Sequence, residues 1–421
     1  MTGVQTCALP IFPLYSFDRN YFNILGDSAE VLSSVNIDVD DLENIRELEE
    51  EALKEGVIFF GDRKEGTAGE KLAVSGALNF FKEIGAVSGR QYTLEELTDL
   101  GFVTEKYVPF LKFLLKVLGE NGFVTGGPEE GKYVFADMTG AADFEDVYRR
   151  AVREAPDFAV YFELFRKCAL SYREVFCGKR IANEILYPDG RFDYLTEVSE
   201  KTPELKNVNA YVKVLSEAVS DLVRKSGERV RILEIGAGTA ELTLPLIEKV
   251  KNLDFEYYFT DIGPSFVNQA KALFDESTRK KLVFSVFDVE KEPEDNGVPE
   301  NYFDLVIGLD VVQATGSLTG SLSNIRKCLR PAGYAMMIQS LRVPDISQMI
   351  FGYAPGWWNY DRDPMRSGKS IAADPGQWKE AYTAASFEDF TVITGGRDGK
   401  RNDCGVLIGK APCCGLCDKN V

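Results

Sequence analysis

The sequence predicts an α/β protein, in which residues 229–411 form a doubly wound domain that follows a helical cap and a winged-helix-like segment. Two observations carry this prediction. From residue 230 onward, short apolar runs alternate with helical patterns, as in a parallel sheet with helices on both faces. Before that point, residues 38–140 combine helical patterns with one hairpin, and residues 141–228 have helical periodicity throughout.

The winged-helix-like segment, residues 38–140, is predicted from the order of its elements. Helical patterns over residues 38–60 and 70–84 are followed by Thr93 and Glu96, which form a capping-box signature for a further helix. A strongly apolar helix and the hairpin FVTGGPEEGKYVF complete the unit. A winged helix can bind DNA, but the second helix carries few basic residues, so a packing or dimerisation role is favoured.

Residues 141–228 are predicted to form a helical cap or linker layer. The stretch FAVYFELFRKCALSYREVF is apolar on more than one face, which indicates burial against a neighbour. Residues 13–37 are interpreted as a linker and residues 412–421 as a tail. Residues 1–12 resemble a translated sequencing adapter and are interpreted as an assembly artefact, so we expect the chain to be a fragment of a longer protein.

Composition argues against several classes of function. No apolar run approaches the ~20 residues that span a bilayer, and the net charge of −18 disfavours anionic membranes and phosphate backbones. We therefore expect neither a membrane nor a nucleic acid as a partner. Cys168, Cys177 and Cys328 lie in apolar helical patterns, as in a protein of the reducing cytosol. The C-terminal cysteines contain a single CxxC, so no metal site is predicted.

Five apolar runs are the predicted strands of the doubly wound domain, namely RVRILEIGAG, FEYYFTDIG, KLVFSVFDVE, FDLVIGLDVV and AGYAMMIQSL. Ligands of open α/β sheets bind at the carboxyl ends of the strands. The first end, LEIGAGTAELTL, places Glu234 on the strand and Gly236 and Gly238 in the turn before a helix, where a backbone can approach a ligand closely. Glu241 occupies the third glycine position of a dinucleotide fingerprint, which argues against NAD or FAD.

Two further strand ends carry aspartates. Asp261 closes the second strand, where a carboxylate can accept hydrogen bonds from both ribose hydroxyls. Asp288 follows the third strand and is placed to accept from an exocyclic amine such as that of adenine. Glycines also end strands and acids also cap helices for structural reasons alone. Three such strand ends in succession nevertheless predict a site for an adenosine that carries an amino-acid tail.

These residues resemble those of class I S-adenosylmethionine-dependent methyltransferases. The chain resembles most closely the C-methyltransferase domains of polyketide synthases and hybrid peptide synthetases, through YYFTDIGPSF, FDLVIGLDVVQAT, IRKCLRPAGYAMMIQS and IFGYAPGWWNYDRDP. The similarity runs from about Cys168 through Phe390, and FGYAPGWW is its most discriminating part. The resemblance implies a seven-stranded Rossmann-like core and a cytoplasmic enzyme that methylates the α-carbon of a β-ketoacyl thioester. It also implies two partners, an acyl carrier protein with a phosphopantetheine-linked substrate and neighbouring synthase domains.

The resemblance further implies which residues bind S-adenosylmethionine. The residues assigned to its methionine part are Glu234, Gly236, Ala237 and Gly238, those assigned to the ribose are Asp261 with Ile262 beside it, and those assigned to the adenine are Asp288 with Val289 beside it. Tyr353, Trp357 and Trp358 are assigned to a substrate lid, and core packing is an equal alternative for the two tryptophans. Tyr353 and Tyr360 are expected to assist as hydrogen-bond partners.

Three positions depart from the pattern of this group. The glycine usual after GAGT is Ala240, which we expect to be a mild change because alanine still allows close packing. The catalytic histidine is Gln313 and its acidic partner is Gln339, and an amide cannot accept the proton between two carbonyls. We expect Gln313, held in place by Gln339, to stabilise an enolate. Asp310 is the nearest replacement base, provided that burial raises its pKa.

Three functions therefore remain open at the level of sequence. The first is a C-methyltransferase that uses a different base or a more acidic substrate. The second is a catalytically impaired pseudo-methyltransferase that has a structural role beside neighbouring domains. The third is a winged-helix O-methyltransferase that acts on a small molecule, which the PGWW segment fits less well.

Overall fold

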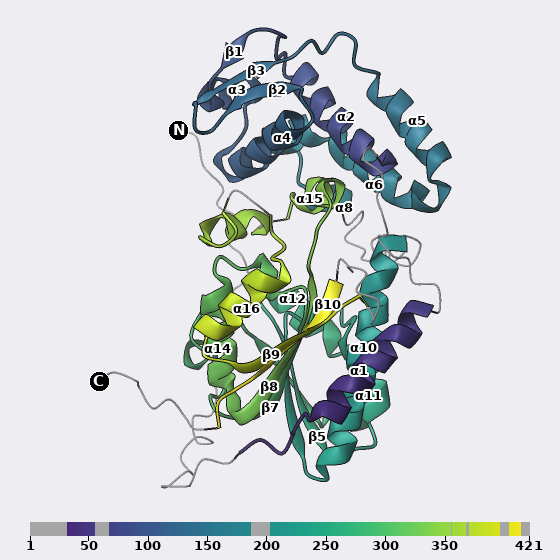
Figure 1. Ribbon diagram of the computed structural model, residues 1–421, viewed down its shortest axis with the longest axis vertical. Helices are drawn as coiled ribbons and strands as arrows, with labels where there is room; N and C mark the ends of the chain where they lie inside the picture. The colour runs from purple at the N-terminus through teal and green to yellow at the C-terminus, as the bar shows by residue number, and fades with distance from the viewer. Residues whose placement is uncertain are drawn as a thin grey trace, which may run out of the picture. The chain divides into compact units, whose positions relative to one another are not determined.

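The computed structural model describes residues 32–54, 67–186, 203–354, 356–367, 370–395 and 404–413 (Figure 1). The expected artefact at residues 1–12, most of the linker at 13–37 and residues 414–421 of the tail lie outside the described residues. No helix in the described ranges is both long and apolar enough to cross a membrane.

Seven strands form one sheet in the order β6-β5-β4-β7-β8-β10-β9. They are β4 (Val230–Ile235), β5 (Phe255–Asp261), β6 (Leu282–Val286), β7 (Phe303–Leu309), β8 (Leu329–Ser340), β9 (Glu388–Ile393) and β10 (Cys404–Lys410). Strands β4 to β8 pair in parallel, whereas β10 is antiparallel to both of its neighbours. The five predicted runs are β4 to β8, and the doubly wound α/β core is confirmed.

Helices cover both faces of this sheet. They are α1 (Val39–Lys54), α10 (Pro203–Ser226), α11 (Thr243–Val250), α12 (Pro264–Ala270), α13 (Glu276–Arg279), α14 (Leu318–Cys328) and α16 (Pro375–Ala384), with 3₁₀ turns η5 (Glu294–Asn296), η6 (Val312–Ala314) and η7 (Trp357–Arg362). Figure 1 shows α1, α10 and α11 on one side of the sheet and α14 and α16 on the other. Because strand side chains alternate, Met336 and Ile338 of β8 face the first layer and Met337 faces the second.

The N-terminal layer contains a small three-stranded sheet of order β1-β3-β2. Its elements are α2 (Ala68–Glu83), β1 (Gln91–Tyr92), α3 (Leu94–Gly101), η2 (Glu105–Tyr107), α4 (Val108–Glu120), β2 (Val124–Gly127), β3 (Lys132–Phe135), α5 (Phe144–Glu154), η3 (Pro156–Phe158), α6 (Ala159–Ala169), α7 (Tyr172–Phe176) and α8 (Asn183–Leu186). The predicted capping box is confirmed, since the Thr93 side chain accepts from the Glu96 N–H and the Glu96 carboxylate accepts from the Thr93 N–H. Helix, strand, two helices and a hairpin follow one another, as in a winged helix.

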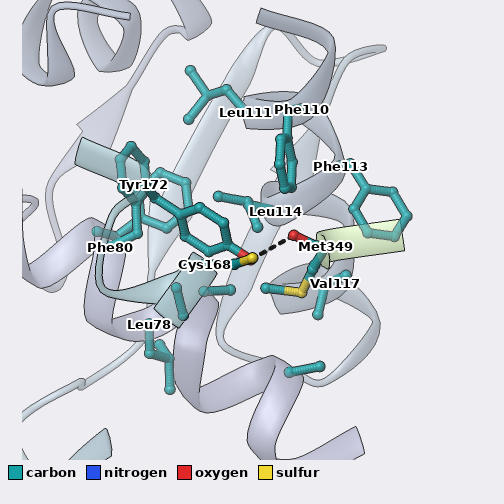
Figure 2. Packing of buried hydrophobic residues seen from close by; sticks show 14 of the residues in the cluster. Leu78, Phe80, Phe110, Leu111, Phe113, Leu114, Val117, Cys168, Tyr172 and Met349 are labelled. Carbon is teal, nitrogen blue, oxygen red and sulfur yellow. Dashed lines mark hydrogen bonds between the residues drawn. The ribbon is translucent and has the colours of Figure 1, made fainter. Parts of the chain in front are cut away.

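The core of this layer is rich in aromatic side chains. Figure 2 shows Phe110 and Tyr172 packed around Met349, which belongs to α15 (Asp345–Phe351), a helix that follows β8 in the chain. The Tyr172 hydroxyl donates to the Met349 carbonyl oxygen at 2.9 Å, and the Tyr353 hydroxyl donates to the Cys168 carbonyl oxygen at 2.6 Å. A segment from the C-terminal half of the chain therefore completes the N-terminal core.

Three predicted domain boundaries need correction. Helix α1 packs on α10, so it belongs with the large sheet and not with the winged-helix-like segment at 38–140. Helix α10 packs against α11, β8 and β10, so the cap predicted at 141–228 ends before it. Helix α15 lies inside the predicted core at 229–411 but packs on α2, α4 and α6. Each error has the same cause, since helical periodicity indicates that one face is buried but not against which partner.

A buried carboxylate holds the amino-terminal edge of the large sheet. Asp304, at the start of β7, is fully buried and accepts from the Arg231 N–H at 2.8 Å and from the Arg330 guanidinium at 3.1 Å. It also accepts from the Ser33 hydroxyl and the Ser34 N–H. The Ile37 N–H in turn donates to the Tyr334 hydroxyl of β8 at 3.2 Å, so residues 33–37 are fastened to the sheet and do not form a free linker.

Candidate functional site

The turn between β4 and α11 contains glycines in the left-handed region. Gly236 has a φ of 57° and Gly238 a φ of 50°. A Cβ on Gly236 would lie 2.3 Å from Cγ2 of Val311, so the loop after β7 packs directly on this glycine. For Gly238, the nearest described atom to such a Cβ would be the Gly236 carbonyl oxygen at 3.9 Å. The backbone at Gly238 is therefore open to close approach by a ligand, as the sequence predicts.

Asp261 joins this turn to the loop after β5. One carboxylate oxygen accepts from the Gly238 N–H at 3.0 Å, and the other accepts from the Gly263 N–H at 2.7 Å. The side chain is buried, and each oxygen still has a lone pair beyond the one that the backbone uses. Asp261 is therefore fixed in position and able to accept two further hydrogen bonds. That arrangement fits the vicinal hydroxyls of a ribose.

Glu234 has a supporting position behind the turn. Its side chain is 1% exposed, and one carboxylate oxygen accepts from both the Thr243 hydroxyl and the Tyr257 hydroxyl at 2.5 Å. Burial raises the pKa of Glu234 to about 7. Thr243 opens α11, so the carboxyl group connects β4, β5 and the start of that helix. This placement indicates a bracing role, and the predicted contact of Glu234 with the methionine part of the cofactor stays a prediction.

The loop after β6 carries the residues predicted to meet the adenine. Asp288 accepts from the Glu290 N–H at 3.1 Å and forms an ion pair with Lys291 at 3.1 Å. Val289 is buried, and its carbonyl oxygen accepts from the Asn324 side chain. Ile262, directly after Asp261, is 64% exposed, which is unusual for a large apolar side chain beside a buried turn. The roles of these three residues stay predictions.

Alanine at position 240, where glycine is usual in this group, costs more conformational free energy than the sequence suggests. Its φ is 70°, in the left-handed region that glycine adopts freely and alanine does not. The side chain is also fully buried against the layer of α10 and α11. The expectation of a mild change is therefore corrected, because the backbone conformation disfavours any side chain at this position.

Asp310 directly follows β7 and has a left-handed conformation, with a φ of 53°. Its carboxylate accepts from the Ser340 N–H at 2.6 Å and from the Ser340 hydroxyl at 2.9 Å. Burial raises the pKa of Asp310 to about 6, and the charge of Glu241 adds to the rise, while the two hydrogen bonds oppose it. A half-buried carboxyl group with this pKa is mostly ionised at pH 7 and is a stronger base than an ordinary aspartate.

Gln313 and Gln339 are both buried, with 5% and 0% of their surface exposed. Among the described residues, the Oε1 of Gln313 and both amide atoms of Gln339 have no hydrogen-bond partner. The expected hydrogen bond by which Gln339 holds Gln313 through these atoms is therefore absent. Gln339 lies on β8, beside the end of β7, where the backbone N–H of Asp310 donates to the Ile338 carbonyl oxygen at 2.9 Å.

A buried arginine that sequence analysis missed fixes the loop of Gln313. Arg366 is fully buried and donates to the carbonyl oxygens of Gln313 at 2.5 Å, Thr315 at 2.7 Å and Ile371 at 3.1 Å. Its counterion is Asp363, which also accepts from the Leu318 N–H at 2.9 Å. No sequence pattern identifies Arg366, because the Gln313 and Thr315 carbonyl oxygens that it binds lie far away in the chain.

The three predicted lid residues have different environments. Tyr353 is buried in the aromatic core of the N-terminal layer, where its hydroxyl donates to the Cys168 carbonyl oxygen, and its assignment to a substrate lid stays a prediction. Trp358 packs on Phe110 and Phe113, and its N–H donates to the Gly352 carbonyl oxygen. The Trp357 ring packs against Phe351 in a tilted arrangement, and its buried N–H has no partner among the described residues. The assignment of Trp357 and Trp358 to a substrate lid stays a prediction.

Tyr360, the second expected hydrogen-bond partner, is buried next to Trp358, and burial raises its pKa. The described part of the chain contains no cluster of three or more histidine, cysteine, aspartate or glutamate side chains that could hold a metal ion.

Comparisons with known proteins place this site in a family context. Residues 233–335, from β4 into β8, match the family described as "Methyltransferase domain". A non-reducing polyketide synthase of Aspergillus terreus is 32% identical over 243 residues, which is 55% of this chain and 8% of that synthase. A hybrid PKS-NRPS synthetase of Trichoderma harzianum is 36% identical over 165 residues, 39% of this chain and 4% of the synthetase. The chain thus spans a small part of the curated relatives that it matches.

Solved structures share its fold. The CurJ carbon methyltransferase superposes with a TM-score of 0.74 at 21% identity, covering 91% of this chain and 100% of that one. The trans-methyltransferase CalH, solved in complex with SAH, superposes with a TM-score of 0.58 at 20% identity, covering 82% of this chain and 93% of that one. The fold similarity therefore extends over the N-terminal layer as well as the sheet.

Proposed function

We propose that this chain, which carries a class I methyltransferase domain of the polyketide synthase type, methylates the α-carbon of a β-ketoacyl thioester bound to a carrier protein. The observation that carries the proposal is the Asp261–Gly238 junction, which fits a nucleoside, in a chain similar to polyketide synthases. The partners that the reaction requires are an acyl carrier protein and the neighbouring domains of a synthase.

The cofactor of the proposed reaction is S-adenosylmethionine, which supplies an electrophilic methyl group on a sulfonium when it is bound. Asp261 would bind the ribose through its free lone pairs, and the backbone around Gly238 would hold the amino-acid end. Asp288 and Ile262 would contact the adenine, the first by accepting from its amine and the second by apolar contact. Glu234 supports these groups from behind, through Thr243 and Tyr257.

Asp310 is the base of the proposed reaction. Its raised pKa of about 6 lies near neutral pH, where a base is both ionised and able to accept a proton. Gln313 contributes hydrogen bonds to a substrate oxygen, because an amide can donate and accept but cannot take up a proton. Methyl transfer itself depends mainly on positioning, so we expect slow but measurable turnover without the histidine that the family uses.

The direct experiment incubates the protein with S-adenosylmethionine and an acetoacetyl thioester on a carrier protein and follows the product by mass spectrometry. Gain of one methyl group at the α-carbon supports the proposal. Asp310→Asn should lower the rate by roughly a hundredfold, the contribution of one general base. Asp295→Asn, which changes an exposed aspartate outside the site, should leave it unchanged.

A second candidate function, a module without catalysis, is favoured by one observation, the replacement of both dyad positions by Gln313 and Gln339. The double variant Gln313→His with Gln339→Glu distinguishes these two candidate functions, an active methyltransferase and a module without catalysis. A large gain of turnover over an inactive wild type would identify a domain that has lost its activity. Robust methylation by the wild type would exclude this candidate.

A further inference from the structure

We propose that Glu290 is a positioning residue that couples binding of the cofactor to the loop that carries Gln313. The inference rests on the proposed function and deepens it, because it connects two parts of the site that the function uses separately. These parts are the cofactor loop after β6, residues 288–290, and the Gln313 loop after β7, residues 313–318. The inference starts from one exposed carboxylate that is bonded to the second loop.

Glu290 is connected to both loops by hydrogen bonds. Its backbone N–H donates to the Asp288 carboxylate at 3.1 Å, and its own carboxylate accepts from the Gly316 N–H at 2.6 Å. The charged acceptor makes the second bond stronger than one between neutral groups. Asp288 is the residue predicted to accept from the adenine amine. A single residue, Glu290, therefore separates the predicted adenine contact from the Gln313 loop.

Gly316 lies where three segments of the chain meet. A Cβ at this position would lie 3.0 Å from the Glu290 Oε1 and 3.6 Å from both the Asn359 carbonyl oxygen and Cδ of Arg362. The cofactor loop, the Gln313 loop and η7 thus come together at one glycine. Since η7 carries the two tryptophans predicted to form the lid, a change in the cofactor loop can be transmitted to both sides of the predicted substrate site.

A second set of hydrogen bonds holds the Gln313 loop from the interior. Arg366, which is fully buried, donates to the carbonyl oxygens of Gln313 and Thr315. Its counterion Asp363 is buried as well. Because these bonds are already shielded from water, a ligand bound nearby changes their strength little. The Glu290 bond is exposed, so its strength depends on how much water surrounds it.

This contrast supplies the differential interaction that coupling between two sites requires. With a nucleoside on the cofactor loop, Asp288 is fixed and the Glu290 carboxylate is less exposed to water. Both effects strengthen its hydrogen bond to Gly316, so the Gln313 loop is held more firmly when the thioester binds. Because coupling is reciprocal, the thioester should tighten binding of the nucleoside by the same factor.

The test measures this coupling by calorimetry on the intact chain. The acetoacetyl pantetheine thioester is titrated with and without saturating S-adenosylhomocysteine. For the wild type, we expect the nucleoside to tighten thioester binding at least about fivefold, the low end for coupled sites. Glu290→Met, which keeps the side-chain length but removes the carboxylate, should lower this factor below about twofold. Glu290→Gln, whose amide oxygen can still accept from the Gly316 N–H, should retain most of it.

Hydrogen exchange gives an independent measurement without the thioester. S-adenosylhomocysteine should slow amide exchange over residues 312–318 in the wild type and in Glu290→Gln, but not in Glu290→Met. The matched control is Glu292→Met, which removes an exposed carboxylate two residues further along the chain. Glu292 pairs with Lys327 on α14 and not with the Gln313 loop, so this variant should behave as the wild type.

A merely structural role of Glu290 would weaken binding of each ligand but leave the coupling factor unchanged. Thioester affinity that ignores the nucleoside in the wild type, or a full coupling factor in Glu290→Met, would overturn the inference and leave the proposed function intact. If the thioester alone gives no heat, the exchange measurement decides the inference. A well-folded wild type that does not bind S-adenosylhomocysteine would refute the proposed function, and the inference with it.

Discussion

At the scale of single residues, Gly236 is the position in the turn after β4 that tolerates a side chain least. Gly236→Ala would place a Cβ 2.3 Å from Val311 in a left-handed backbone. We expect a loss of about 3 kcal/mol in the free energy of unfolding, since overpacking adds to backbone strain. Urea denaturation measures it. The control is Gly227→Ala, at a φ of 67° with no described atom within 4 Å, which should cost only about 1 kcal/mol.

Glu234 gives the protein a pH-dependent stability. The folded chain holds this proton up to a pKa of about 7, whereas the unfolded chain loses it near 4.5, so stability falls as pH rises between these values. The Glu234→Gln substitution removes this titration, which changes the free energy of unfolding by roughly 3 kcal/mol across that pH range. Its unfolding free energy should decline less than that of the wild type between pH 4.5 and pH 8.

The control for this measurement is Glu228→Gln, which changes an exposed glutamate just before β4. It should follow the pH profile of the wild type. Identical profiles for Glu234→Gln and the wild type would show that the buried carboxyl does not govern this pH dependence.

Some residues could be predicted from sequence and others could not. Asp261 and Gly238 lie in the predicted arrangement, because strand ends and glycine turns have local signatures. The packing of Tyr353 could not be predicted, because the segment that carries it packs into a core whose other residues lie far away in the sequence. Ala240 was misjudged because its cost depends on φ, which sequence alone does not specify.

At the scale of elements, the large sheet depends on the Asp304 carboxylate, which fastens β7 to β4, β8 and residues 33–34. Asp304→Asn leaves the Arg330 guanidinium, itself largely buried, without its counterion. We expect a loss of about 3 kcal/mol, measured by urea denaturation. Asp254→Asn removes an ion pair that is exposed on both sides and should cause no measurable change. Equal effects of the two variants would contradict this assignment.

The elements themselves were largely predictable. Strands β4 to β8 have continuous apolar runs because both faces of a parallel sheet are buried, and α3 begins at its capping box. Helix α15 was not predicted, because seven residues give too short a periodic pattern. Short elements depend on tertiary contacts, which cannot be predicted from the residues of the element alone.

At the scale of the whole described chain, α15 ties the segment that follows β8 to the apolar core of the N-terminal layer. Met349 is fully buried among N-terminal side chains, although it follows β8 in sequence. Met349→Ala should lower the unfolding free energy by about 3 kcal/mol, from lost burial and the cavity left behind. Differential scanning calorimetry should also show the transition of the N-terminal layer separating from that of the sheet. Ile181→Ala, at an exposed position, should keep a single transition at the wild-type temperature.

The measurement that tests the central claim most directly is calorimetric titration of the intact chain with S-adenosylhomocysteine, beside Asp261→Ala and Asp295→Ala. The account predicts that the wild type and Asp295→Ala bind the nucleoside with micromolar affinity, and that Asp261→Ala loses at least roughly tenfold, the value of one hydrogen bond to a charged group. A well-folded wild type that gives no heat at millimolar nucleoside, or an Asp261→Ala variant that binds as tightly as the wild type, would contradict it.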